Sequence, residues 1–184
     1  MEQTEIVFKE FPKIYRLNRE VIVTEKIDGT NASIYIGENG EFLTGSRTQW
    51  ITPEKDNYGF SRWAHEHKEE LLKLGKGTHF GEWWGQGCQR GYGLPKGEKR
   101  FSLFNTFKWG VERPSCCSVV PILYQGLFKQ DEIIKCLERL KTGGSLASPG
   151  FMKPEGIVIF HTQGNFGLKV TIEKDEEHKG IITP

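Results

Sequence analysis

Lys26 is the side chain in this sequence whose setting most suggests chemistry. It lies in the segment TEKIDGTN, residues 24–31, between the apolar run VIV and an Asp-Gly turn, so the pattern places its amine at a strand end. A lysine amine is almost wholly protonated at neutral pH, since its unperturbed pKa is about 10.4. It acts as a nucleophile only where nearby cations or a metal favour the neutral form. Taken alone, the segment favours the simpler interpretation, a strand end capped by an Asp-Gly turn with a solvated lysine.

Further charged residues follow at positions where they could assist such a lysine. Arg47 ends the segment FLTGSR, Glu82 lies in HFGEWWG, Glu155 in KPEGIVI and Lys169 in GLKV. Singly, each is typical of a surface charge or an ordinary turn. Together they supply the cations and carboxylates that a lysine nucleophile needs as partners.

The elements that position these residues can be predicted from periodicity. Alternating and β-branched residues predict strands near 21–25, 32–36, 41–45, 78–83, 101–107, 118–123, 156–160 and 167–172. The sequence GENG predicts a hairpin between the second and third strands. Helical spacing predicts two helices, within 60–75 and 130–144, each ending in glycine. The expected fold is therefore α+β, mainly antiparallel sheets with flanking helices.

Length and composition set the class of protein. The 184 residues favour one domain over 1–184, with no separate C-terminal nucleic-acid-binding domain. The formal net charge of +1 indicates no bulk attraction to nucleic acid, so any basic surface must be local. No apolar run approaches the roughly 20 residues of a membrane span, and no signal peptide is recognisable. We therefore expect a cytoplasmic protein that has no contact with a membrane.

The charged motifs occur in an order that resembles a known family. Lys-x-Asp-Gly, Ser-Arg, Gly-Glu, FSLFNTF, Glu-Gly-Ile-Val-Ile and Leu-Lys-Val are similar to the motif series of the covalent nucleotidyltransferases, the polynucleotide ligases and RNA capping enzymes. The match extends from about Thr24 to Val170. The segments EKIDGTN, FGEWWGQGCQRGYG and SPGFMKPEGIVI most resemble the phage-type ATP-dependent RNA ligases, a nick-sealing family. The resemblance implies an adenylylation domain with an ATP-grasp-like ligase fold.

The resemblance also implies a reaction and its catalytic groups. Lys26 would attack the α-phosphorus of ATP and keep AMP, which then passes to an RNA 5′-phosphate before a 3′-hydroxyl displaces it. Lys169 would lie against the α-phosphate, and Glu155 would hold Mg²⁺, or alternatively Mn²⁺, directly or through water. Asn31 would contact the phosphate or the 3′ terminus. Asp28 would orient Lys26 or a metal-bound water, or would serve the turn alone.

Contacts to the nucleoside are implied in the same way. Glu25 would recognise adenine through its backbone, while Arg47 and Glu82 would contact the ribose. Phe104 would stack on adenine in preference to Phe107, because residues three apart in a regular strand face opposite sides. The predicted binding residues for ATP or AMP are thus Glu25, Lys26, Asn31, Arg47, Glu82, Phe104, Glu155 and Lys169.

The sequence departs from the family pattern in two places. Thr171 stands where the last motif commonly has a second lysine, so a phosphate contact is missing or has moved to Lys174. The chain also ends soon after this motif, whereas ligases of this group often add a domain that grips the nucleic acid. We therefore expect weak substrate binding or reliance on a partner.

Other functions compatible with the motifs remain as alternatives. A minimal ATP-dependent DNA ligase would seal DNA ends as well as RNA ends, whereas an RNA ligase uses the 2′-hydroxyl to distinguish them. A capping-type guanylyltransferase would use GTP. A non-catalytic nucleotide- or RNA-binding relative is disfavoured, because a binding protein has no need of Lys26 together with Glu155 and Lys169.

Overall fold

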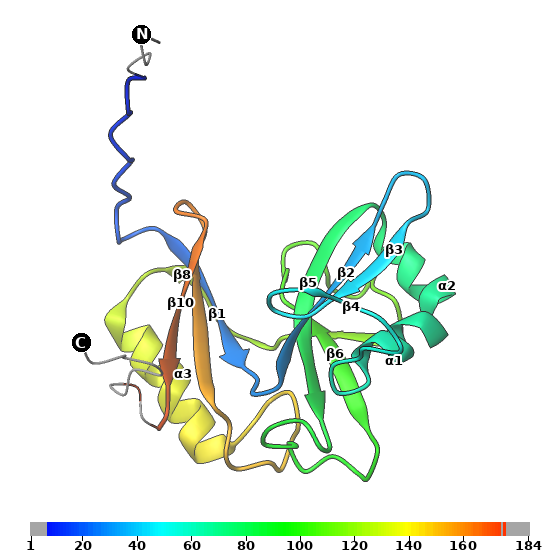
Figure 1. Ribbon diagram of the computed structural model, residues 1–184. Helices are drawn as coiled ribbons and strands as arrows, with labels where there is room; N and C mark the ends of the chain where they lie inside the picture. Colours follow the sequence, from blue (N-terminus) through cyan, green and yellow to red (C-terminus); the bar gives the residue numbers. More distant parts are fainter. Residues whose placement is uncertain (1–6, 174, 176–184) are drawn as a thin grey trace, which may run out of the picture.

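Two sheets form the body of the protein in the computed structural model, which describes residues 7–173 and residue 175 (Figure 1). The first sheet has the order β10-β9-β1-β8 and is antiparallel throughout. Its strands are β1 (Glu20–Lys26), β8 (Ile122–Leu127), β9 (Gly156–His161) and β10 (Phe166–Thr171). The second sheet has the order β4-β3-β2-β5-β6-β7 and is antiparallel except for its β6–β7 pair. Its strands are β2 (Thr30–Ile36), β3 (Phe42–Gly45), β4 (Trp50–Ile51), β5 (Gly77–Gly85), β6 (Lys99–Leu103) and β7 (Cys117–Val119).

The first sheet has one face covered by helix α3 (Gln130–Gly143). Val21 and Val23 of β1 are fully buried against Leu140 of this helix and the apolar residues of β9. Because successive side chains of a strand point to opposite faces, the residues between them, and Lys26 after them, face away from α3. The amphipathic pattern of one strand thus directs Lys26 away from the helix.

The second sheet is covered by a helical segment in three parts. These are α1 (Phe60–Glu66), α2 (Lys68–Leu71) and a 3₁₀ turn (Leu72–Leu74). Phe60 of α1 is fully buried, and its ring centroid lies 5.5 Å from that of Trp83 in β5. The Asp56 carboxylate accepts hydrogen bonds from the backbone N–H groups of Ser61 and Arg62, at 2.7 and 3.1 Å. It therefore satisfies donors that the first turn of a helix leaves free.

The structure confirms the α+β class and corrects three of the predicted elements. The helix predicted within 60–75 is interrupted at His67, where φ is −103°. The strand predicted at 101–107 ends at Leu103. The strand predicted at 118–123 divides at Pro121, so that its two halves, β7 and β8, belong to different sheets. Proline has no N–H to donate and therefore interrupts a ladder.

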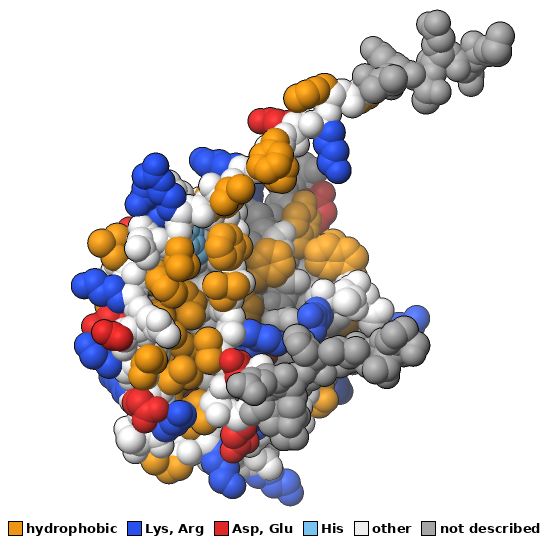
Figure 2. Space-filling model, turned by 90° about the vertical axis from the view of Figure 1, so that its left-hand side faces the viewer, with side chains coloured by type: hydrophobic (Ala, Val, Ile, Leu, Met, Phe, Trp, Pro, Cys, Tyr) orange, Lys and Arg blue, Asp and Glu red, His pale blue; other side chains and the backbone are white. Residues whose placement is uncertain are grey.

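Residues 7–15 form an extended segment that runs away from the body, and apolar side chains lie along it (Figure 2). Val7, Phe8, Phe11 and Ile14 are each at least 78% exposed. Across residues 7–173, no helix has the length and apolar character needed to cross a membrane.

Candidate active site

A cavity of about 870 Å³, open to solvent, lies between the two sheets. Its wall on the first sheet is formed by the face opposite α3, from Ile22, Thr24, Lys26, Val158 and Phe160. Its wall on the second sheet includes Asn31, Thr78, Phe80 and the segment 104–109. Residues from both ends of the chain therefore meet around one space, and Lys26 is among them.

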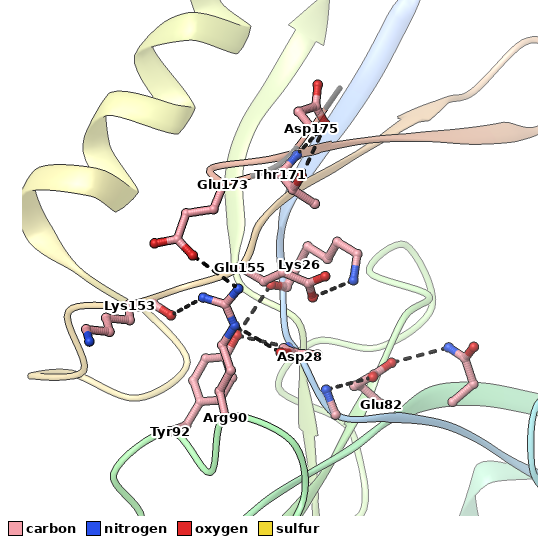
Figure 3. A network of polar contacts seen from close by, with 12 residues as sticks. Lys26, Asp28, Glu82, Arg90, Tyr92, Lys153, Glu155, Thr171, Glu173 and Asp175 are labelled. Carbon is pink, nitrogen blue, oxygen red and sulfur yellow. Dashed lines mark hydrogen bonds and ion pairs between the residues drawn. The ribbon is translucent and has the colours of Figure 1, made fainter. Parts of the chain in front are cut away.

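Lys26 is paired with Glu155 at the cavity. β1 and β9 run antiparallel with Lys26 opposite Gly156, so the residue just before β9 is brought beside the end of β1. The distance from Lys26 Nζ to Glu155 Oε2 is 2.5 Å (Figure 3). The two side chains are only 23% and 11% exposed, so water screens this pair less than it screens a surface ion pair.

Glu82 lies across the sheet register from Asn31 and accepts two hydrogen bonds. Gly29 N donates to Glu82 Oε1 at 3.0 Å, and Asn31 Nδ2 donates to Oε2 at 3.3 Å. Burial raises the pKa of Glu82 to about 7, although the Gly29 N–H and the charge of Lys26 act in the opposite direction. This carboxyl group therefore titrates near neutral pH, beside the turn that follows Lys26.

This raised pKa predicts a pH-dependent stability. The Glu82 carboxyl binds its proton more tightly in the folded chain, where its pKa is about 7, than in the unfolded chain, where it is 4.5. The protonated carboxyl therefore contributes its full stabilisation to the fold below pH 4.5, and this contribution is lost as the pH rises through 7. We expect Glu82→Gln, a neutral isostere, to remove this loss, which is at most roughly 3 kcal/mol. Melting temperatures of both proteins from pH 5 to 8 test this. Parallel curves for the two proteins would contradict it.

Asp28 is held by the loop that joins β5 to β6, residues 86–98. Arg90 Nε donates to Asp28 Oδ2 at 2.9 Å, and the backbone N of Asp28 donates to the Tyr92 hydroxyl at 2.9 Å (Figure 3). Burial raises the pKa of Tyr92, which stays protonated and also donates to the carbonyl of Lys26 at 3.5 Å. Of the two roles predicted for Asp28, its contacts favour holding the turn over orienting the amine of Lys26.

Glu25 borders the cavity, but its carboxylate is turned toward the loop after α3. It is 99% buried and accepts hydrogen bonds from Ser145 Oγ at 2.5 Å, Leu146 N at 2.8 Å and Ala147 N at 3.0 Å. Its own backbone N donates to the Pro121 carbonyl at 2.9 Å. The side chain thus fastens the end of β1 to a loop, and a role in recognising adenine is left to its backbone.

Lys169 lies on the cavity face of the first sheet but is not among the residues that line the cavity. In the β10-β9-β1 register it is opposite Val158, which is in turn opposite Thr24, and both of these line the cavity. Directly opposite residues of antiparallel strands point to the same face. Two residues later, Thr171 N donates to Asp175 Oδ1 at 2.8 Å. Lys174, the predicted substitute for the missing second lysine, lies outside the described residues.

The aromatic wall differs from the sequence prediction. Phe104 and Phe107 both line the cavity, although a regular strand would have turned them to opposite faces. The strand ends at Leu103, and Thr106 N donates to the Phe104 carbonyl in a turn at 2.9 Å. The alternation of side chains along a regular strand therefore does not extend to Phe104 and Phe107. Arg47 is exposed on the turn between β3 and β4 and is not among the lining residues. Glu82, Glu155 and Lys169 are likewise absent from that lining, so the ribose contact expected of Arg47 stays a prediction.

The donor set suits a metal that arrives with its phosphates. Among residues 7–173 and 175, no three His, Cys, Asp or Glu side chains are grouped to hold an ion by themselves. Mg²⁺ commonly takes only one or two protein carboxylates and completes its shell with water and substrate phosphates. Glu155, a single carboxylate 11% exposed beside Lys26, fits that mode of binding.

Three residues of this site were not predicted from the sequence. Val158 lines the cavity opposite the second sheet, while Arg90 and Tyr92 hold the turn after Lys26. The available signal was the Gly-rich loop GQGCQRGYG, since long loops in compact domains are often functional. It indicated the segment but could not indicate which of its side chains faces Lys26.

Comparisons with known proteins agree with this geometry. Residues 19–174 match the sequence model of a protein family described as RNA ligase. No curated protein matches the chain.

Solved structures of Naegleria gruberi RNA ligase have a similar fold. A mutant with ATP and Mn shares 22% identity at a TM-score of 0.62, covering 89% of this chain and 53% of that one. A mutant with AMP and Mn shares 21% at 0.61, and an apo mutant shares 20% at 0.62, each covering 84% of this chain and 50% of that one. The present chain therefore spans about half the length of these ligases, and at such identities the likeness concerns the fold.

Proposed function

Because the chain belongs to the RNA ligase family, we propose that it is an ATP-dependent RNA ligase that joins a 3′-hydroxyl to a 5′-phosphate through lysine-AMP and adenylylated-RNA intermediates. The observation that carries this proposal is the pairing of Lys26 with Glu155 beside a cavity between two sheets. A nucleophile, a carboxylate and an aromatic-lined space are the parts that nucleotidyl transfer requires.

The first step forms a bond between Lys26 Nζ and the α-phosphorus of ATP. The bond from that phosphorus to the bridging oxygen breaks, and pyrophosphate leaves. The amine needs its lone pair for this attack, so the ammonium form of Lys26 must first give up a proton. The Glu155 carboxylate, 2.5 Å away, is placed to accept a proton from it.

The surroundings of Lys26 suggest how the nucleotide is held. Phe104 and Val158 line the cavity from opposite sheets, and an adenine ring between them would have an apolar surface on each side. Lys169 projects from the same face as Val158 and supplies a positive charge for the α-phosphate. Glu82 lies beside Asn31, within the part of the site where ribose hydroxyls would find an acceptor.

The later steps transfer and then release AMP. An oxygen of the RNA 5′-phosphate attacks the phosphorus of lysine-AMP, the N–P bond breaks, and Lys26 is regenerated. The 3′-hydroxyl then attacks the 5′-phosphate, a phosphodiester forms, and AMP leaves. A divalent ion held by Glu155 would neutralise phosphate charge in these reactions.

Measurement of intact mass after incubation with ATP and Mg²⁺ tests the proposal. We expect one adenylyl group per chain, mapped by peptide analysis to Lys26, and no such product with GTP. Sealing is then compared on nicks that carry RNA or DNA on the 3′ side, with RNA expected to react faster. Nucleotide binding by a folded chain that forms no adduct would instead identify a non-catalytic relative.

Salt should separate adenylylation from sealing. Sealing requires contacts to an RNA backbone. Each phosphate neutralised by Lys or Arg makes the slope of log binding constant against log salt concentration more negative by roughly 0.7 to 0.9. Adenylylation requires only ATP, so its slope should be shallower. Both rates are measured on the same preparation between low and physiological salt. Equal slopes would mean that backbone charge does not hold the RNA.

A further inference from the structure

Arg90 contacts three segments of the chain that are distant in the sequence. Its Nε donates to Asp28 Oδ2 at 2.9 Å, and its Nη1 donates to the Lys153 carbonyl at 3.0 Å. Its Nη2 lies 4.0 Å from Glu173 Oε2. Figure 3 shows the guanidinium at the centre of these contacts.

The contacted residues stand next to the groups of the proposed reaction. Asp28 is two residues after Lys26, and Lys153 is two residues before Glu155. Glu173 follows β10, the strand that carries Lys169. One side chain from the 86–98 loop thus joins the three segments that bear the nucleophile, the carboxylate and the second lysine.

The segment that bears Glu155 depends on such contacts. Residues 151–155 lie in neither a helix nor a strand, so no ladder of backbone hydrogen bonds fixes their course. Backbone bonds hold the two ends of the segment: Phe151 exchanges them with Ser145 and Ser148, at 2.8 and 3.1 Å, and the Glu155 carbonyl accepts one from Ile172 N at 2.9 Å. The β1–β9 register brings Glu155 beside the end of β1, and the bond from Arg90 to the Lys153 carbonyl adds a tie between the middle of the segment and the turn after Lys26.

The chemistry of arginine suits this task. A guanidinium has five N–H donors in a fixed plane, whereas a lysine ammonium is a compact point charge on a flexible stem. The side chains of Arg90 and Asp28 are 28% and 26% exposed, so their ion pair is better shielded than a surface pair. Tyr92, fully buried two residues later, fixes the loop from which Arg90 extends.

We propose that Arg90 is a positioning residue that holds Lys26 and Glu155 at their working separation, and so sets the rate of AMP transfer without binding the nucleotide. This inference rests on the proposed ligase function. It predicts a change in rate at saturating ATP that has no matching change in ATP affinity, because the nucleotide contacts remain while the reacting groups are displaced.

The test is single-turnover adenylylation by Arg90→Lys, which keeps the positive charge and removes the planar set of N–H donors. We expect the rate at saturating ATP to fall about 10- to 100-fold, as small misplacements of reacting groups do. The ATP concentration for half-maximal rate should change by less than about threefold. Arg100→Lys is the matched control: Arg100 makes a two-nitrogen contact to Glu98 at the end of the same loop, at 2.9 and 2.5 Å, and this variant should keep the normal rate.

A double-mutant cycle with Glu155→Ala separates positioning from a general loss of stability. If Arg90 acts partly through Glu155, the two substitutions together should cost less than the product of their separate effects. Independent, multiplicative effects would overturn the inference. So would a rate loss in Arg90→Lys that disappears once the rate is corrected for the folded fraction measured by circular dichroism.

The outcome for the unmodified chain distinguishes the two proposals. If it forms no AMP adduct, the proposed function fails, and the role of Arg90 fails with it. If it forms the adduct at Lys26 and Arg90→Lys does so at the same rate, only the inference about Arg90 is overturned.

Discussion

Lys26→Ala is expected to form no AMP adduct with ATP and to fail on ordinary 5′-phosphate RNA, yet to retain measurable sealing of RNA supplied already adenylylated. The reason is that Lys26 serves as a nucleophile only when AMP is loaded. In the last step of the proposed reaction the 3′-hydroxyl attacks the activated 5′ end, and Glu155 and Lys169 are the groups proposed to stabilise its transition state. The measurement is the pair of sealing rates with pre-adenylylated RNA in the absence of ATP, for the variant and the unmodified chain.

Lys169→Ala provides the comparison for this experiment. Its charge should serve the phosphate in both reactions, so this variant should be impaired in adduct formation and also in sealing of pre-adenylylated RNA. Circular dichroism must first show that both variants are folded, because removal of a lysine stem can also disturb packing. An adduct in Lys26→Ala, or an adduct of the unmodified chain on another lysine, would show that Lys26 is not the nucleophile.

Glu155→Ala is expected to reduce adenylylation by about 100-fold or more, the scale on which one preorganised charged or polar group contributes to a transition state. The substitution removes the carboxylate that contacts Lys26 and that would hold the divalent ion. Glu155 lies at a loop-strand junction outside the three apolar clusters, so we expect the fold to survive. Raised Mg²⁺ or Mn²⁺ should restore activity only in part, since the ion can then bind phosphate alone.

Glu138→Ala is the control for this second prediction. Glu138 lies on α3 with a side chain 56% exposed and pairs with Lys141, so its loss should leave both the rate and the metal dependence unchanged. Full activity of Glu155→Ala at ordinary Mg²⁺ would remove Glu155 from the site. Unfolding of Glu155→Ala at room temperature would instead mean that its pairing with Lys26 is needed by the fold.

The residues near Lys26 show how far the sequence alone could determine the site. Short-range patterns sufficed for the α+β class, for the β2–β3 hairpin and for the strand end at which Lys26 sits, because these depend on the alternation of neighbouring side chains. The order of charged motifs indicated the family, which the match over residues 19–174 confirms. It also identified Lys26 and Glu155 as residues of one site 129 positions apart, and the structure pairs them.

Only the tertiary structure could decide what depends on contacts between distant segments. The predicted strand at 118–123 divides because its halves pair with strands of different sheets, and pairing partners are not encoded locally. Phe104 and Phe107 share the cavity because their strand ends early, at Leu103.

Arg90 is the clearest example of this division. As one charged residue in a Gly-rich loop, it carries no local pattern that distinguishes it from a solvated cation, and its partners are 62 and 63 residues away. Its role follows from where the loop is held against the turn after Lys26 and against the segment before Glu155. The sequence by itself therefore determined the family and supplied the residues proposed for its chemistry, because those depend on side-chain type and short spacing. Which side chains hold them at working distance was decided by folding, because that depends on directional contacts between segments that meet only in three dimensions.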